Sequence, residues 1–124
     1  MNGSTVSLVG RVMFCLPLVL FGFNHFANAQ MMAPMVPIPG GVIWVYFTGA
    51  ALLAAAVSII LNKMTKLSGL LLGIMLIAFA LGVHLKGMLE ATDEMAKMTF
   101  FTGMIKDLGL AGAAFYISGK NWES

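Results

Sequence analysis

The sequence predicts an all-α integral membrane protein that folds as an antiparallel four-helix bundle, with an apolar Pro/Gly-rich loop between the first two helices. The 124-residue chain is 60% hydrophobic and 10% charged, and its mean hydropathy of +0.93 is too apolar for an ordinary soluble domain. Four apolar stretches are each long enough to cross a hydrocarbon layer of about 30 Å as a helix. They fall at approximately 6–29, 42–61, 67–89 and 98–118 within a single domain, 1–124.

The first predicted helix, 6–29, begins after a short polar start. Pro17 removes one backbone hydrogen bond inside it and is expected to kink it. Arg11 is expected to reach the lipid headgroups with its long side chain. The stretch also resembles a secretory signal, because Ala27-Asn28-Ala29 follows its apolar run. Pro17 and Asn24-His25 are poor components of a signal core, so the sequence favours a retained helix.

The segment 30–41 separates the first two helices. It holds three prolines and the pair Gly40-Gly41, which predict an irregular loop and not a helix or strand. It also carries no charge and several methionines. Since a solvated loop does not need so many apolar side chains, we expect the segment to lie in the membrane interface or to fold back over the bundle as a lid.

The second helix, 42–61, begins near Trp44, an aromatic residue typical of the membrane interface. The polar turn 62–66 is short, which predicts that the second and third helices form a tight antiparallel pair. After the third helix, the charged residues between 86 and 97 predict a surface segment, in which Thr92-Asp93 can cap a short helix before the last crossing.

Charge indicates how the bundle lies in the membrane. Lys63 and Lys66 occupy the turn between the second and third helices, and Lys120 lies in the tail, whereas acidic residues dilute the lysines of 86–97 on the other side. Because cytoplasmic loops carry an excess of lysine and arginine, both termini are predicted to be cytoplasmic. In a bacterium this means a multi-pass inner-membrane protein with the 30–41 loop on the periplasmic side.

Several classes of function lack support in the sequence. The seven basic and five acidic residues form no run that follows a phosphate backbone, so nucleic acid is not an expected partner. Cys15 is the one cysteine, which excludes an internal disulfide and a zinc site built from cysteines. The glycines punctuate apolar helices and form no phosphate-binding loop, and no serine has a plausible base beside it.

A few polar residues interrupt the apolar helices, and this is costly unless they find partners. Asn24-His25 ends the first helix, His84 lies near the end of the third, and Lys106-Asp107 lies within the fourth. The expected topology brings all of them to the same side of the membrane. Antiparallel helix axes lie about 8–10 Å apart, so Asp107 is expected within hydrogen-bond reach of a histidine.

Several roles for these residues stay open. Asp107 can pair with Lys106 or a histidine and thereby fix the helix register. A histidine oriented by a carboxylate can also exchange a proton with a quinol. The small space and the common depth of the two histidines disfavour haem, and the methionines lack the paired spacing that favours Cu(I). No catalytic residue and no metal ligand is assigned.

The polar residues sit in five local patterns: Gly22-x-x-His25-Phe26, the loop from Met35 to Pro37, Trp44-x-Tyr46-x-Thr48-Gly49, Val83-His84-Leu85 and Lys106-Asp107-Leu108-Gly109. Together these patterns resemble the DoxX family over all four crossings. Members of that family are small four-helix bacterial inner-membrane proteins, some of them subunits of thiosulfate:quinone oxidoreductase and others associated with oxidative-stress membrane complexes. Better-known members carry a lysine where His25 stands here.

This resemblance implies a redox-associated accessory subunit whose polar pocket, near the periplasmic face, is compatible with a quinone. The alternative is a structural subunit that docks a larger membrane protein complex and has no chemistry of its own. Besides the lipid bilayer, the expected partner is such a complex or a second copy of the chain, and enzymatic activity is left open. Transport is disfavoured, because four short crossings leave little room for two alternating openings. The expected pocket residues are Asn24, His25, Trp44, His84, Lys106 and Asp107.

Overall fold

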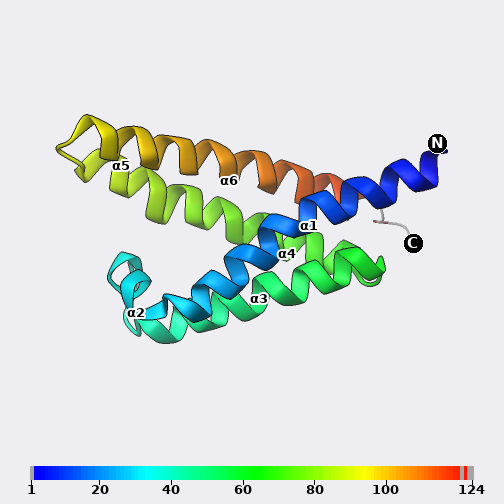
Figure 1. Ribbon diagram of the computed structural model, residues 1–124, viewed down its shortest axis with the longest axis horizontal. Coiled ribbons are helices and arrows are strands. Elements are labelled where there is room, and N and C mark those ends of the chain that lie inside the picture. The colour runs from blue at the N-terminus through cyan, green and yellow to red at the C-terminus, as the bar shows by residue number, and fades with distance from the viewer. Residues whose placement is uncertain (1, 121, 123–124) are drawn as a thin grey trace.

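The computed structural model describes residues 2–120 and 122, and helices make up most of this part of the chain (Figure 1). No strand occurs in the described residues, so the fold is all-α. The elements are α1 (Gly3–Ala27), α2 (Ala29–Met32), η1 (Ala33–Met35), α3 (Val42–Leu61), α4 (Thr65–Phe79), η2 (Ala80–Leu85), α5 (Lys86–Glu90) and α6 (Glu94–Lys120).

Four helical segments of the described chain are long and apolar enough to cross a membrane: α1, α3, the continuous helix Thr65–Glu90 and α6. Their outer faces expose large apolar side chains such as Met13, Phe47 and Leu71. Water would make this arrangement costly, whereas lipid tails solvate apolar side chains as well as a protein core does. By length and composition, the chain is therefore a membrane protein.

The connection between the first two spans differs from the irregular loop predicted for 30–41. Short helical turns, α2 and η1, continue after Asn28 as far as Met35. Pro34 lies at the start of η1, where its missing N–H costs no hydrogen bond. The chain then reverses through Gly40 and Gly41, whose positive φ angles of 113° and 44° favour glycine. The prolines therefore do not exclude helix here, because the first of them lies at a helix start.

The charged segment before the last span also differs from its prediction. α6 begins at Glu94, and the Asp93 carboxylate accepts a hydrogen bond from the Met95 N–H at 3.3 Å. Asp93 therefore starts the fourth span itself, not a separate surface helix. Glu94 lies in the first turn of α6, where the helix dipole favours an acidic side chain.

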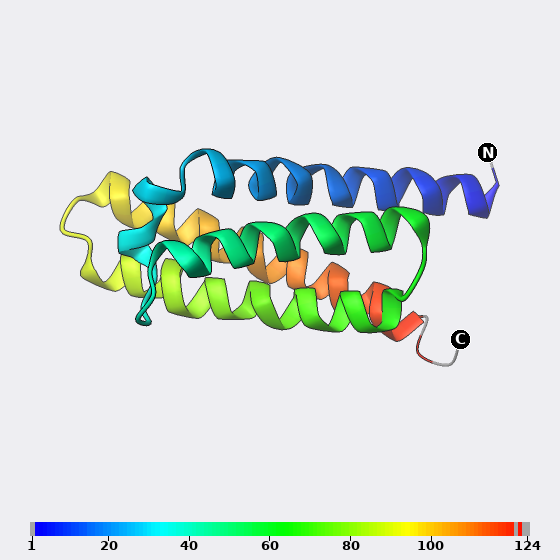
Figure 2. The same cartoon turned by 90° about the horizontal axis from the view of Figure 1, so that it is seen from below.

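The helices pack as two pairs, α1 with α3 and α4 with α6. In Figure 1, α1 runs toward α2, α3 runs back, α4 runs out toward α5, and α6 returns. The Gly3 end of α1 and the Lys120 end of α6 therefore lie at one end of the molecule (Figure 2). The tight pair expected between the second and third helices is not the main one, since α3 and α4 contact each other less extensively than each contacts its other partner.

Glycines explain this choice of partners, because they allow the backbones within each pair to approach closely. A Cβ built on Gly22 of α1 would lie 3.2 Å from the carbonyl oxygen of Gly49 in α3. A Cβ on Gly69 of α4 would lie 2.7 Å from the carbonyl oxygen of Ala114 in α6. The short turn 62–66 places α3 next to α4. The closest backbone contacts, however, lie at the glycines, between α1 and α3 and between α4 and α6.

The core lies where the two pairs meet. Leu18, Leu52, Leu76 and Ala111, one from each span, are buried in the same cluster. Near the chain ends, the Ser118 hydroxyl of α6 donates a hydrogen bond to the Lys66 carbonyl at 2.6 Å. Away from this end the two pairs spread apart toward α2 and α5 (Figure 1).

Candidate functional site

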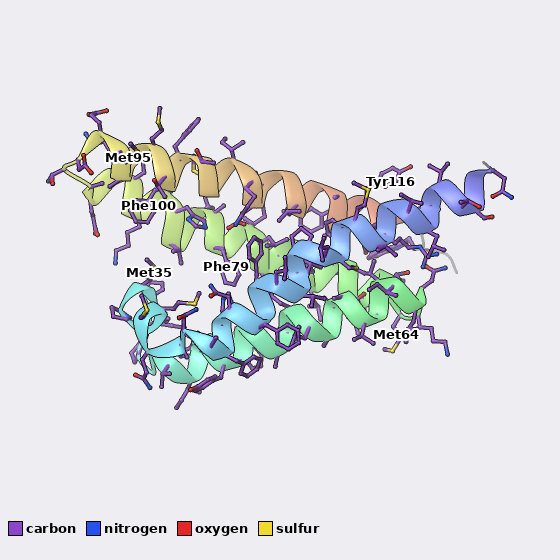
Figure 3. All side chains as sticks on the ribbon, in the orientation of Figure 1. Met35, Met64, Phe79, Met95, Phe100 and Tyr116 are labelled. Atoms are coloured by element: carbon purple, nitrogen blue, oxygen red, sulfur yellow. The ribbon has the colours of Figure 1, made fainter. Side chains whose placement is uncertain are left out.

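A cavity of about 540 Å³ lies between the two helix pairs, at the end of the molecule that carries α2. Figure 3 places Phe79 on the α4 side of this region and Met35 on the α2 side. The volume falls in the range of about 300–1,000 Å³ that is typical of small-molecule sites. All six residues expected in the pocket line this cavity: Asn24, His25, Trp44, His84, Lys106 and Asp107.

Most of the cavity wall is apolar, and these apolar residues were not predicted as part of the pocket. Phe21 lines the cavity one helical turn before His25, a spacing of four residues that places both on one helix face. That spacing is a signal in the sequence that predicts Phe21 on the same side as His25. The remaining wall residues include Met32, Val36, Ile38, Val45, Phe47, Leu52, Met75, Leu76, Phe79 and Val83.

Asp107 is the most deeply buried charged residue of this site, with 2% of its surface exposed. It lies on the inner stripe of α6 together with Ala111, Ala114 and Ser118, which are also buried and follow at helical spacing. Its Oδ2 lies 2.9 Å from His84 Nε2, and its Oδ1 lies 3.4 Å from Lys106 Nζ. Two groups that can carry positive charge therefore face one buried carboxylate.

The contact between His84 and Asp107 is close but poorly aligned. Although Nε2 and Oδ2 are 2.9 Å apart, Oδ2 has no hydrogen-bond partner among the described residues, and neither does His84 Nδ1. The carboxylate therefore lies off the direction in which the ring nitrogen directs a hydrogen bond. Oδ2 is closed off from solvent and has no partner among the described residues, so it is a costly buried acceptor.

A wide helical turn presents His84. Residues 80–85 form a π-helical turn inside the continuous helix Thr65–Glu90. A π turn closes its hydrogen bonds one residue later than an α turn and is frequent at functional sites. The imidazole packs on α6 at Gly103, where a Cβ would lie 2.7 Å from Nδ1. The wide turn and the glycine together place the imidazole beside Asp107.

His25 lies on the α1 side of the cavity with one ring nitrogen already engaged. Its Nδ1 is 2.6 Å from the Phe21 carbonyl oxygen. Because a carbonyl oxygen accepts hydrogen bonds, Nδ1 carries the proton, and Nε2 of the neutral ring is an acceptor. The ring also stacks on Phe79, with 6.4 Å between the ring centroids. His25 does not pair with Asp107; His84 does.

Lys106 connects the buried carboxylate with the aromatic part of the wall. Its ammonium lies 4.2 Å from the centroid of the Phe21 ring, a distance typical of a cation–π contact. The same ammonium lies 3.4 Å from Asp107 Oδ1. With His84 neutral, the charges of Lys106 and Asp107 cancel, so the site suits an uncharged ligand with polar groups.

Asn24 and Trp44 have partners within the protein. The Asn24 side-chain oxygen accepts a hydrogen bond from the Asn28 amide. The Trp44 indole N–H donates to the Pro39 carbonyl at 2.6 Å. Its ring also packs over Gly40, where a Cβ would lie 2.8 Å from Nε1. Trp44 thus holds the 36–41 segment against the cavity, and its N–H is not free to bind a ligand.

These features define a class of protein: an α-helical membrane protein with a buried carboxylate in the wall of a largely apolar, ligand-sized cavity. Residues 14–105 match the model of the family described as Domain of unknown function (DUF8561), so the chain belongs to the DUF8561 family. The matched region includes His25 and His84 and ends just before Lys106 and Asp107. No curated protein and no solved structure matches the chain. The resemblance to the DoxX family stays a prediction.

Proposed function

We propose that the chain is an inner-membrane accessory protein that binds a quinone or quinol in the cavity between the two helix pairs. The observation that carries this proposal is the buried Asp107 carboxylate, paired with His84 and Lys106, in the wall of a largely apolar cavity of about 540 Å³. A quinone likewise combines apolar parts, its tail and ring, with two polar oxygens. The resemblance to the DoxX family, some of whose members are subunits of a quinone-reducing complex, points the same way.

The side chains fit both oxidation states of such a ligand. The Lys106 ammonium can donate a hydrogen bond to a quinone carbonyl, and the Asp107 carboxylate, which also lines the cavity, can accept one from a quinol hydroxyl. Reducing a quinone consumes two electrons and two protons. His84 and Asp107 are groups that exchange protons, and the electrons arrive from a partner subunit. A chain that binds the quinone and supplies protons, while a partner supplies electrons, is a redox-associated accessory subunit.

Quinone binding to the purified protein tests the proposal. In lipid nanodiscs, a short-tailed quinone is expected to quench the fluorescence of Trp44, which lines the cavity. In a Trp122→Phe background, Lys106→Ala is expected to weaken binding about tenfold or more, the size of one lost charge-assisted hydrogen bond to the quinone carbonyl. Lys97→Ala, the same change in a half-buried lysine outside the cavity, serves as the control. Equal affinities of the two variants, with both folded, would contradict the proposal.

The proposed arrangement in the membrane is an antiparallel four-helix bundle with both termini cytoplasmic and the cavity near the periplasmic face. It is supported by the lysines around 62–66 and by the location of both chain ends at one end of the molecule (Figure 2). A reporter enzyme fused after the last residue is expected to be active on the cytoplasmic side. Activity on the periplasmic side would reverse the arrangement.

The second candidate function is a structural subunit that docks a larger membrane complex without chemistry of its own. Gly109 and Gly112 of α6 favour it, since both are exposed and a Cβ on either would meet nothing within 4 Å. Small outward-facing residues allow another helix to approach closely. Gly109→Leu with Gly112→Leu is expected to abolish co-purification of a stoichiometric partner while leaving the fold intact. If alanine at both histidines leaves the activity of that complex unchanged, this function replaces the first.

A further inference from the structure

A second cavity, of about 470 Å³, lies at the other end of the molecule, where α1 begins and α6 ends. Arg11 and Ser7 from α1, Asn62 from the α3–α4 turn, and Tyr116 and Lys120 from α6 line it. None of these residues contributes to the proposed quinone site. The two cavities are therefore separate sites.

Among the described residues, the charged side chains at this end of the molecule are all positive. Arg11 and Lys120 line the cavity, and Lys63 and Lys66 lie in the neighbouring turn. The carboxylates of the described residues all lie in the opposite half, in the 86–97 segment or at the quinone site. Within the part of the chain that the structure describes, the cations of this cavity have no acidic partner. The positive charge of the described residues therefore attracts an anion to this cavity.

The guanidinium of Arg11 is held in place and keeps donors free. Its Nη1 group donates to the carbonyl oxygens of Ile59 at 3.2 Å and Ile60 at 2.9 Å, at the carboxyl end of α3. A guanidinium has five N–H donors in a rigid fork that matches phosphate geometry. The contacts through Nη1 fix its plane, so the remaining N–H groups can bind an outside acceptor without further loss of side-chain freedom.

The depth of the cavity matches the headgroup layer of a membrane. α3 has 20 residues, which at 1.5 Å each span about 30 Å, the thickness of the hydrocarbon core. The end of α3 therefore marks the boundary of the hydrocarbon, and Arg11 and Asn62 lie at this level. Figure 2 shows the start of α1 extending beyond the α3–α4 turn. Phosphate groups of lipids lie at this depth.

We propose that this cavity binds the phosphate of an anionic phospholipid from the leaflet next to the chain ends. Arg11 supplies a fixed planar donor set from α1, and Lys120 supplies a second cation from α6. Basic pockets between membrane helices bind anionic lipid headgroups in this way. A lipid bound there bridges α1 and α6, which belong to different helix pairs.

Native mass spectrometry of the full chain, released from micelles that contain equal amounts of an anionic and a zwitterionic phospholipid, tests the proposal. The wild-type chain is expected to retain one anionic lipid in preference to the zwitterionic one. Lys120→Gln is expected to lower this retention about tenfold or more, the size of one lost charge-assisted hydrogen bond. Arg11→Gln is expected to do the same, and thermal unfolding shows whether it also loosens α3.

Lys63→Gln is the matched control, because it removes the same charge from the same end of the molecule but not from the cavity. It removes general attraction to an anionic surface, worth about 1 kcal/mol per lysine, and is expected to lower retention at most about fivefold. Equal losses for Lys63→Gln and Lys120→Gln would overturn the proposal, and so would equal retention of the two lipids. Displacement of the lipid by millimolar inorganic phosphate would show that free phosphate, not a lipid, is the ligand.

Discussion

Gly69→Ala is expected to destabilise the bundle by about 1–3 kcal/mol, because α4 and α6 have no room for a methyl group between them. The new Cβ would lie 2.7 Å from the Ala114 carbonyl oxygen and 3.0 Å from the Ser118 backbone nitrogen. Both are backbone atoms, which cannot move aside as a side chain can. The two helices must separate, and the hydrogen bond from the Ser118 hydroxyl to the Lys66 carbonyl is lost with the contact.

The control is Gly112→Ala on α6, where a Cβ would meet nothing within 4 Å. The same chemical change there is expected to be neutral or to stabilise by about 0.5–1 kcal/mol, since alanine favours helix over glycine. Unfolding by a denaturing detergent, followed by a probe of tertiary structure, measures both changes. The helices stay helical in micelles, so a helicity signal alone would miss the effect. Equal stability of the two variants would show that α4 and α6 are farther apart than the structure has them.

A second large effect is expected when the Asp107 carboxylate loses both of its partners. His84→Leu combined with Lys106→Met would leave a buried charge without compensation, which costs about 3–5 kcal/mol in typical proteins. Asp107 is 2% exposed, so water cannot take over from the lost partners. The double variant is therefore expected to unfold at a markedly lower detergent fraction than the wild-type protein.

Adding Asp107→Leu to this double variant is expected to restore most of the lost stability. The triple variant has an apolar side chain at each of the three positions, and well-packed apolar residues often replace a buried ion pair at no cost. Recovery in the triple variant separates the effect of charge from that of altered packing. If the double variant is as stable as the wild-type protein, the carboxylate does not carry a charge in the folded protein.

Much of the fold was predictable because lipid imposes simple requirements on sequence. An apolar run of about 20 residues is a strong signal, and the four stretches named from hydropathy overlap α1, α3, Thr65–Glu90 and α6. The pairing was not predictable in the same way, since small residues occur on every span. Only the structure shows that Gly22 and Gly69 lie where backbones approach.

The candidate site was partly predictable, because a polar residue in lipid needs a partner. This requirement was enough to group Asn24, His25, His84, Lys106 and Asp107, all of which line one cavity. It did not select which histidine contacts Asp107. That choice depends on the π-helical turn at residues 80–85, which leaves no periodic signal in a short apolar sequence. Quinone binding itself stays a proposal.

The π-helical turn also makes this site sensitive to chain length. A regular helix rotates by about 100° per residue, so removing one residue from 80–85 would turn a different side chain toward α6. An apolar side chain that faced α6 in place of His84 would still pack well in these apolar surroundings, and the span would still cross the membrane. Insertions and deletions of a single codon at this point can therefore remove or create an imidazole–carboxylate contact during evolution without disturbing membrane insertion.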